Sequence, residues 1–312
     1  MTLLAVHSLD AVVFQVRDLE PGRRFYATFG LRVDDQGQRL RLGAHGHDHH
    51  WAEVHDGWTG PGQKHLHFLR FACHEADFEA LRARCLAHAP ACDPHPLGDA
   101  RGCWFQHPDG YAIQLVVGPV TSPTLPLPVA PPEVVPLGQG KSLPRSAVKP
   151  VQPRRLSHAL LFSPDVPRSA QFFLQTVGLK VSDSSGDLIY FLHGAHGSDH
   201  HMLGLVKSEG PGLHHLSWDV ASVHQVGLGM EQMLQAGFTR GWGVGRHVLG
   251  SNYFYYAQDP WGSFCEFSHD IDHIPAGLEW PARDHPAEDS FYAWGPAVPD
   301  FFTVNTELDA AG

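Results

Sequence analysis

The sequence repeats itself. Three short motifs of the first half return in the second half in the same order: an Arg/Gln-Phe-Tyr/Phe segment ending in Gly-Leu, a Gly-Ala-His-Gly-x-Asp-His-His segment, and a turn with Pro-x-Gly. They lie at residues 24–31, 43–50 and 107–110 and return at residues 171–179, 194–201 and 259–262. Duplication of one unit is the economical explanation of this order. The chain is therefore expected to fold as two related halves.

A proline-dense segment, residues 119–153, separates the two halves. Because proline fixes φ and lacks an N–H group, such a segment cannot sustain a helix or a central strand, and it is typical of an extended linker or of a strap lying across one domain. The expected division is an N-terminal domain at 1–118, the linker, a C-terminal domain at 154–270 and a tail at 271–312. With 312 residues, 43% of them hydrophobic, the chain can form two packed cores.

Each half is predicted to contain the same series of elements: strand, helix, strand, strand, helix and a closing hairpin. Asp18 and Asp165 stand where Asp is favoured at the start of the first helix. The series predicts an α+β fold with two βαβββ-like modules in each half. Strands are expected at 11–16, 50–54, 66–72, 103–107, 112–117, 158–163, 201–206, 213–220, 253–258 and 263–267, and helices at 18–29, 75–89, 165–177 and 223–236.

Charge and composition exclude several classes of partner. The formal net charge is −11 and no Lys/Arg cluster occurs, so a nucleic-acid partner is not expected. The sequence has neither an apolar stretch long enough to span a bilayer nor the charged and apolar regions of a signal peptide, so no membrane partner is expected and the predicted location is the cytoplasm. Five Cys without a C-x-x-C pair indicate free thiols.

Three polar residues of the second half, His158, His215 and Glu266, each lie inside a short apolar segment with strand character. A single His in such a segment is more often a hydrogen-bonded core residue than a ligand, and the chain has 24 His. A buried carboxylate is costly unless it meets a cation, so Glu266 is the most informative of the three. Two imidazoles and one carboxylate form the ligand set of a non-haem Fe(II) site with open coordination positions.

The first half lacks this ligand set. Alignment of the two halves pairs the three positions with Ala11, Phe68 and Gln114, which offer no imidazole or carboxylate. The His-rich segment at residues 45–50 has tight loop spacing and a counterpart in the other half, which favours inherited module geometry over a metal cluster. The N-terminal half is therefore expected to be free of metal.

The second half also contains a signature stretch in which His247 precedes Tyr256 by nine residues and Tyr256 precedes Glu266 by ten. On these residues the chain resembles the vicinal oxygen chelate superfamily and, within it, the two-domain type I extradiol ring-cleavage dioxygenases. The resemblance covers nearly the whole length. It implies paired modules that form cup-like mixed sheets, with a metal-free N-terminal domain.

The resemblance implies that His158, His215 and Glu266 hold Fe(II), with Mn(II) as a possible replacement. It favours His215 over its neighbour His214, and strand alternation excludes both from facing the same metal. No further cofactor is implied.

The resemblance further implies three acid/base residues, His201, His247 and Tyr256, with His201 preferred to His200. Tyr256 and His247 would accept or stabilise the proton lost by the substrate, and His201 would face the bound oxygen as a hydrogen-bond donor. An aromatic run such as the one around Tyr256 is usually core packing, but the two spacings favour a catalytic role. Asn252 is a weaker candidate for placing the ligands.

The implied function is extradiol (meta) cleavage of a catechol-type or trihydroxylated ring, with both atoms of O2 incorporated. Family members that recognise an anionic side chain supply an Arg near the pocket, whereas this chain has Trp242 at that position. Leu160 and Leu249 stand where some members have polar residues. These departures favour a substrate with apolar, halogen or small polar substituents over one with a carboxylate arm.

Two alternatives stay open at this point. One is a related metalloenzyme of isomerase, epimerase or thiol transferase type, and the other is a non-catalytic module that binds an aromatic ligand. Homo-oligomers are usual in the family, so a homo-oligomer is expected. The aromatic tail after residue 270 could close over the pocket mouth or form subunit contacts.

Overall fold

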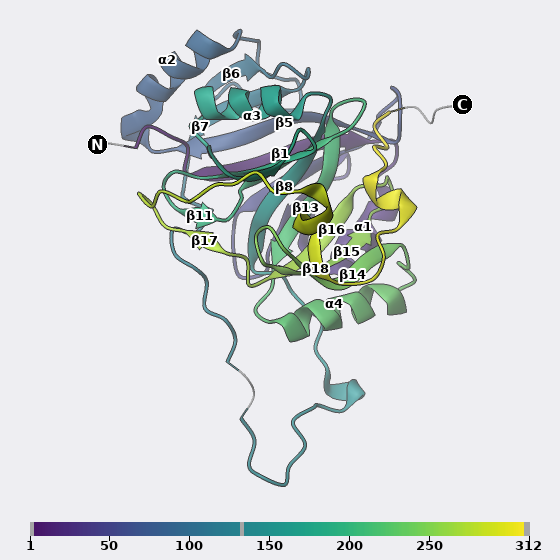
Figure 1. The fold of residues 1–312 in the computed structure, drawn as a ribbon. Helices are drawn as coiled ribbons and strands as arrows, with labels where there is room; N and C mark the ends of the chain where they lie inside the picture. Colours follow the sequence, from purple (N-terminus) through teal and green to yellow (C-terminus); the bar gives the residue numbers. More distant parts are fainter. Residues whose placement is uncertain (1–2, 132–133, 309–312) are drawn as a thin grey trace.

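The computed structural model describes residues 3–131 and 134–308, and the expected α+β class is confirmed. The N-terminal half begins with a βαβββ module (Figure 1). Its elements are β1 (Ser8–Val16), α1 (Glu20–Phe29), β2 (Arg32–Asp35), β3 (Arg39–Gly43) and β4 (His50–His55), followed by β5 (Lys64–Cys73), the 3₁₀ turn η1 (Glu75–Asp77), α2 (Phe78–His88), β6 (Cys103–Gln106) and β7 (Ala112–Val117).

The C-terminal half contains two complete βαβββ modules and the tail. The first comprises β8 (Arg155–Ser163), α3 (Val166–Gln175), β9 (Lys180–Ser185), β10 (Ile189–His193), β11 (Ser198–Asp199) and β12 (Leu203–Lys207). The second comprises β13 (Gly212–Asp219), α4 (Val223–Gln235), β14 (Gly241–His247), β15 (Tyr253–Gln258) and β16 (Phe264–His269). The tail carries β17 (His273–Ile274), α5 (Ala287–Ser290), β18 (Tyr292–Trp294) and η3 (Asp300–Thr303).

Within the described ranges the strands form a seven-stranded sheet, a nine-stranded sheet and a two-stranded ribbon. The seven-stranded sheet has the order β2-β3-β4-β1-β5-β7-β6, and the nine-stranded sheet has the order β18-β14-β15-β16-β13-β8-β12-β10-β9. The first strands of the two modules, β1 with β5 and β8 with β13, pair antiparallel in the middle of each sheet. The duplication seen in the sequence is thus present in the topology.

Strand register explains why the three polar residues of the second half share one face. His158 lies opposite Ser217, and Ser217 lies opposite Glu266, so these three side chains leave the sheet on the same side. His215 precedes Ser217 by two residues and therefore points to that side too. In the other half the same register places Ala11 and Gln114 opposite Arg70, with Phe68 two residues earlier, as the alignment expects.

The second module of the N-terminal half is shorter than expected. Residues 89–102 follow α2 as a loop without a strand of its own, and an isolated bridge joins its Ala91 to Phe105 of β6. Three prolines in this loop, at positions 90, 94 and 96, explain the missing strand because proline cannot donate a ladder hydrogen bond.

The helix starts differ between the halves. Asp165 caps α3 by accepting a hydrogen bond from the Arg168 N–H at 3.2 Å, as expected. Leu19, and not Asp18, is the cap residue of α1, although the Asp18 carboxylate accepts from the Glu20 N–H at 2.9 Å. Both carboxylates still lie at the positive end of their helix.

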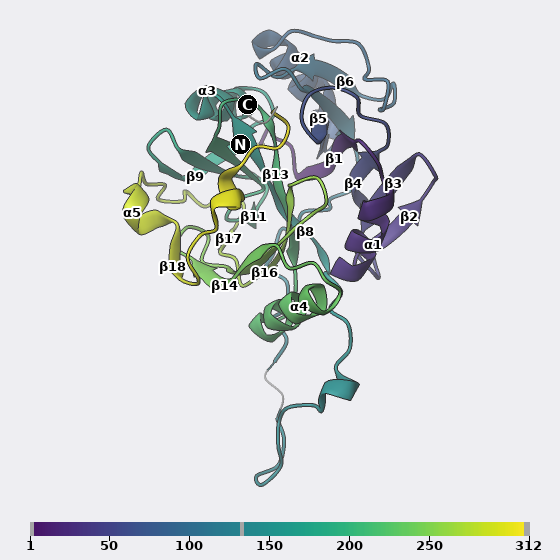
Figure 2. The same ribbon diagram turned by 90° about the vertical axis from the view of Figure 1, so that its right-hand side faces the viewer.

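The two halves pack against each other through their helices and share one hydrophobic core. The rings of Phe29 from α1 and Phe267 from β16 stack with centroids 3.8 Å apart. The described parts of the proline-dense segment, 119–131 and 134–153, extend from this body, and the second of them carries the short turn η2 (Arg145–Ala147) (Figures 1 and 2). The domain and linker boundaries stay predictions. None of the helices in the described ranges is long and apolar enough to cross a membrane.

Candidate metal centre and substrate pocket

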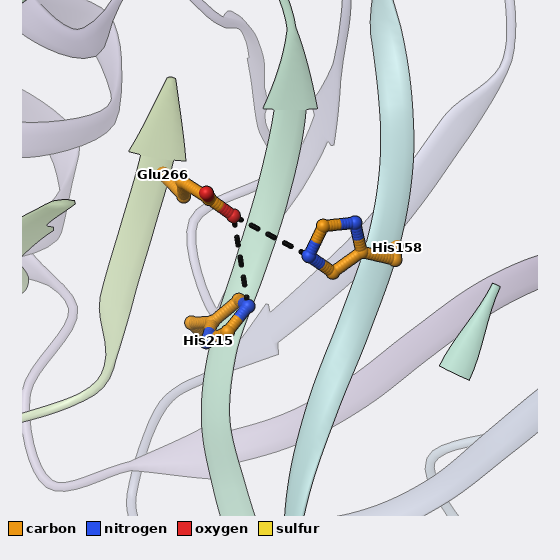
Figure 3. Close-up of side chains that lie close together, drawn as sticks. All are labelled: His158, His215 and Glu266. Atoms are coloured by element: carbon orange, nitrogen blue, oxygen red, sulfur yellow. Dashed lines mark ion pairs between the residues drawn. The ribbon is translucent and has the colours of Figure 1, made fainter. Parts of the chain in front are cut away.

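Three neighbouring strands of the nine-stranded sheet aim His158, His215 and Glu266 at one point (Figure 3). The distance to Glu266 Oε2 is 3.3 Å from His158 Nε2 and 3.7 Å from His215 Nε2. Each residue offers one potential ligand atom, and these three atoms lie within 4.8 Å of one another. Among the His, Cys, Asp and Glu side chains of the described residues, these three are close enough together to hold a metal ion. The three side chains therefore lie within reach of one ion.

The polar atoms of this group fit a divalent cation. Glu266 is fully buried, and its Oε1 accepts a hydrogen bond from Asn252 Nδ2 at 3.0 Å. His215 Nε2 and Glu266 Oε2 are buried without a hydrogen-bond partner among the described residues. A buried carboxylate oxygen left in this state is costly, and a bound metal would satisfy both orphaned atoms at once.

The protonation states also suit metal binding, which needs neutral imidazoles and an ionised carboxylate. Burial raises the pKa of Glu266, but the adjacent imidazoles of His158 and His247 outweigh burial, so the pKa is lowered. Burial, followed by the neighbouring imidazoles, holds the pKa of His215 well below its usual value.

A cavity of about 230 Å³ opens above these residues. Its wall is mostly apolar and aromatic, and among the described lining residues none is Lys or Arg. The lining residues are His158, Leu160, Ser185, Leu188, Ile189, Phe191, His201, Val206, His214, His215, His247, Leu249, Asn252, Tyr256, Ala287, Ser290, Phe291, Phe302 and Thr303. Such a wall suits an aromatic ring without ionised substituents.

His247 and Tyr256 form a hydrogen-bonded pair beside Glu266. His247 Nδ1 lies 2.9 Å from the Phe291 carbonyl oxygen, which can only accept, so this nitrogen carries a proton. In the neutral ring, Nε2 then accepts from the Tyr256 hydroxyl at 2.9 Å. Burial, with the charge of Glu266, raises the pKa of Tyr256 well above its usual value, so the phenol stays protonated.

His201 lines the same cavity from the other side of His158, with the two ring centroids 4.0 Å apart. Its neighbour His200 turns to Asp183, with His200 Nε2 2.8 Å from Asp183 Oδ2. The structure thus brings together all six residues expected in the site. Five of them line the cavity, namely His158, His201, His215, His247 and Tyr256, and Glu266 lies beside His158 and His215.

His214 and His215 have different surroundings. His215 lies beside Glu266, whereas His214 Nε2 lies 2.9 Å from the Phe302 carbonyl oxygen, to which it donates. The His214 ring also packs edge-on against the Phe302 ring, with centroids 4.9 Å apart. The tail therefore engages His214, and His215 is the one directed to the metal position.

The tail supplies pocket residues that sequence reasoning missed. Residues 270–308, drawn in yellow in Figure 1, cross the nine-stranded sheet and contribute Ala287, Ser290, Phe291, Phe302 and Thr303 to the cavity wall. Strand β18 pairs with β14 and extends the sheet. The aromatic content of the tail was the available signal, and it did not indicate which residues face the pocket.

Comparison with known proteins identifies the family. The model of the Glyoxalase/Bleomycin resistance protein/Dioxygenase superfamily matches residues 8–115 and 155–267, one segment in each half. The chain belongs to this superfamily. It is also 49% identical to Metapyrocatechase 2 of Cupriavidus necator over 304 residues, which cover 97% of this chain and 93% of the relative. The expected membership among the extradiol dioxygenases is thereby confirmed.

Solved structures of the same fold cover almost the whole chain. A Mn(II)-bound glyoxalase from Novosphingobium aromaticivorans matches with a TM-score of 0.74 and 25% identity, over 95% of this chain and 94% of that one. The 2,2',3-trihydroxybiphenyl 1,2-dioxygenase from Sphingomonas wittichii matches with a TM-score of 0.71 and 19% identity, over 95% of this chain and 100% of that one. At this lower identity the second likeness concerns the fold alone.

Proposed function

We propose that the chain catalyses extradiol cleavage of a catechol-type ring by O2 at one Fe(II) ion held by His158, His215 and Glu266. The observation that carries the proposal is the convergence of these three donors at the base of an aromatic-sized apolar cavity. The 49% identity to a metapyrocatechase over nearly the full length supports this reaction.

The donor set suits Fe(II) and also Mn(II). When bound, such an ion supplies open coordination positions at which the two vicinal hydroxyl groups of the substrate and O2 can meet. All three donors come from the C-terminal half, and the corresponding positions in the other half hold Ala11, Phe68 and Gln114. We therefore propose one metal ion per chain.

The hydrogen-bonded pair of Tyr256 and His247 handles the substrate proton. A catechol that enters as a monoanion must lose one hydroxyl proton, and a base must lie within hydrogen-bond reach. The pair lies beside Glu266, with His247 Nε2 3.9 Å from Glu266 Oε1. The Phe291 carbonyl oxygen accepts a hydrogen bond from His247 Nδ1 and so fixes the orientation of the His247 ring. The other ring nitrogen, Nε2, is then the one that accepts or shares a proton.

His201 faces the cavity beside His158, where it would act on reacting oxygen. A preoriented imidazole in a buried site stabilises developing negative charge far better than water does. The apolar wall, including Leu160, Leu249 and Phe191, excludes water and holds the ring. These residues would keep the reaction away from solvent protons.

The cavity wall supports a proposal about the ring substituents of the substrate, because no Lys or Arg of the described chain lines it. Trp242 stacks on Tyr256 with ring centroids 5.6 Å apart and donates its Nε1–H to the Pro296 carbonyl oxygen, so it packs behind the catalytic pair. We propose that ring substituents are apolar, halogen or small polar groups and that a carboxylate arm is disfavoured, since an ionised group would lack a counter-ion.

The test is anaerobic reconstitution with Fe(II), and in parallel with Mn(II), followed by addition of O2 and a panel of catechols and trihydroxybenzenes. The expected result is O2 uptake, a yellow ring-opened product and incorporation of two labelled atoms from ¹⁸O2. A panel without any O2 uptake contradicts the proposal. Turnover without O2 would indicate an isomerase or thiol transferase, and ligand binding that survives Glu266→Ala without turnover would indicate a binding module.

Assembly into a homo-oligomer and a cytoplasmic location stay predictions from the sequence. Light scattering of the purified protein measures the first directly, and a mass equal to a single chain of 34.4 kDa would contradict it.

A further inference from the structure

A buried series of hydrogen bonds runs from the cavity to the tail. His201 Nδ1 lies 3.1 Å from His200 Nδ1, and His200 Nε2 lies 2.8 Å from Asp183 Oδ2. Asp183 Oδ1 then lies 2.9 Å from His285 Nε2 in the tail. His200, His201 and Asp183 are 1%, 3% and 6% exposed, so water does not compete for these bonds.

The direction of each bond follows from the chemistry of Asp183. An ionised carboxylate only accepts, so His200 Nε2 carries a proton. In a neutral His200 ring, Nδ1 is then the acceptor, and the proton between the two rings belongs to His201 Nδ1. His201 Nε2 is left with a lone pair.

We propose that Asp183 and His200 are positioning residues that fix the orientation and the tautomer of His201. This inference rests on the proposed function, in which His201 acts on the substrate or on oxygen. In the assigned tautomer, Nε2 of His201 can take up the hydroxyl proton released by the catechol and later return it to a reacting oxygen. His201 would therefore donate only after it has accepted, which refines the purely donating role expected from the sequence.

Asp183 is held by four donors. Its Oδ2 accepts from His200 Nε2 and from Trp280 Nε1 at 3.2 Å, and its Oδ1 accepts from His285 Nε2 and from the Arg283 N–H at 2.9 Å. Burial raises the pKa of Asp183, but hydrogen bonds from His200, the Arg283 N–H and His285 outweigh it and lower the pKa to about 2. Asp183 is thus a fixed anion, and three of its four partners come from the tail.

The equivalent pair in the other half lacks this linkage. His49 and His50 occupy the positions of His200 and His201 in the repeated motif. His49 Nε2 lies 2.7 Å from the Asp10 carbonyl oxygen, and His50 Nε2 lies 2.8 Å from Arg32 Nη1, so the two rings have separate partners. The coupling of His200 to His201 is therefore specific to the half with the metal residues.

Gly250 leaves room for the pair. Its φ is +86°, a conformation that favours glycine, and a Cβ atom there would lie 3.3 Å from His201 Cε1 and 3.5 Å from His200 Nδ1. A Cβ atom would lie tightly against the His201 ring and in ordinary contact with the His200 ring. The loop before β15 is thus shaped around the two imidazoles.

The direct test is the tautomer of His201 in the metal-free protein labelled with ¹⁵N-histidine. Long-range ¹H–¹⁵N NMR spectra distinguish a proton on Nδ1 from one on Nε2, and the His201→Gln variant identifies the signal. The expected result is His201 with its proton on Nδ1 and His200 with its proton on Nε2. A proton on His201 Nε2, or a doubly protonated His200, overturns the inference.

Kinetics provide the second readout. Asp183→Asn and His200→Gln should lower kcat about 10- to 100-fold, the usual cost of losing such a supporting partner, with little change in the KM for catechol. Asp284→Asn is the matched control, because the exposed Asp284 carboxylate holds Ser184 Oγ and the Gly186 N–H but does not touch His200. Retention of wild-type kcat by both test variants overturns the inference. If the wild-type enzyme itself consumes no O2, the proposed function fails, whereas the NMR result still decides the tautomer.

Discussion

Glu266→Gln should abolish stabilisation by metal and change the stability of the metal-free protein only slightly. The substitution keeps the shape of the side chain and an oxygen that accepts from Asn252 Nδ2, which now lies 3.0 Å away. It removes the negative charge, whose second oxygen is buried without a hydrogen-bond partner in the described chain. Because the neighbouring imidazoles compensate the charge and lower the pKa of Glu266, its removal should make the metal-free variant slightly less stable than the metal-free wild type.

The size of the metal effect follows from linkage. A ligand that binds only the folded state at 100 times its dissociation constant adds about 2.7 kcal/mol to the free energy of unfolding. For chains of roughly this size each kcal/mol raises Tm by about 2–4 °C, so the wild type should gain about 5–10 °C with Fe(II) or Mn(II). The variant should gain almost nothing, because two imidazoles bind a hard cation weakly.

The assay is anaerobic thermal unfolding of both proteins with and without metal. Glu53→Gln serves as the control, because Glu53 is also a buried carboxylate but lies in the other half, 3.1 Å from Arg39 Nη1. The control should keep the full metal-dependent rise in Tm. A Glu266→Gln protein that keeps this rise, or whose metal-free form is several kcal/mol less stable than the wild type, would refute the reasoning.

Three further outcomes are expected. Glu307→Gln leaves the buried Lys64 ammonium, 3.2 Å away, without its counter-ion. It should lower the free energy of unfolding in urea by about 3–5 kcal/mol, and adding Lys64→Met to the same chain should recover part of the loss. An unchanged urea midpoint contradicts this. His107 is buried and its pKa is lowered to about 3, mainly by burial, so the unfolded state binds a proton that the folded state refuses. This residue alone should contribute up to about 2 kcal/mol to the fall in stability from pH 6.5 to 5. In His107→Asn the fall should be smaller by that amount, and an equal slope would argue against it. Leu249→Arg places a cation in the cavity wall. The ratio of kcat/KM for carboxylate-bearing catechols to kcat/KM for alkyl catechols should rise about tenfold. An unchanged ratio would mean that Leu249 does not face the substrate.

The sequence was sufficient for the fold class and for the residues now grouped around the cavity. Each of His158, His215 and Glu266 interrupts an apolar strand, and the period of two along a strand places His215 on the face of Ser217. The duplicated motifs aligned Ala11 and Gln114 with His158 and Glu266. The strand register agrees, because Ala11 and Gln114 both lie opposite Arg70 in the seven-stranded sheet. These features depend on local pattern and repeat order, which a single sequence contains.

Other features depend on contacts between distant segments and were not predictable. The path of the tail over the pocket is fixed by interactions such as that of His214 with the Phe302 carbonyl oxygen, and no periodicity marks them. Asp183 has no distinguishing neighbour in the sequence, since its partners at 280–285 are about a hundred residues away. The missing strand at 89–102 follows from its prolines, which a comparison of the halves by motif alone overlooked.

The most direct measurement is an anomalous difference map from crystals of the Fe(II)-reconstituted protein, collected on both sides of the iron absorption edge. The expected result is one peak per chain, between the Nε2 atoms of His158 and His215 and the carboxylate of Glu266, and none beside Gln114 in the other half. Crystals that contain iron but show the peak elsewhere, or equal peaks in both halves, would contradict a single metal centre in the C-terminal domain.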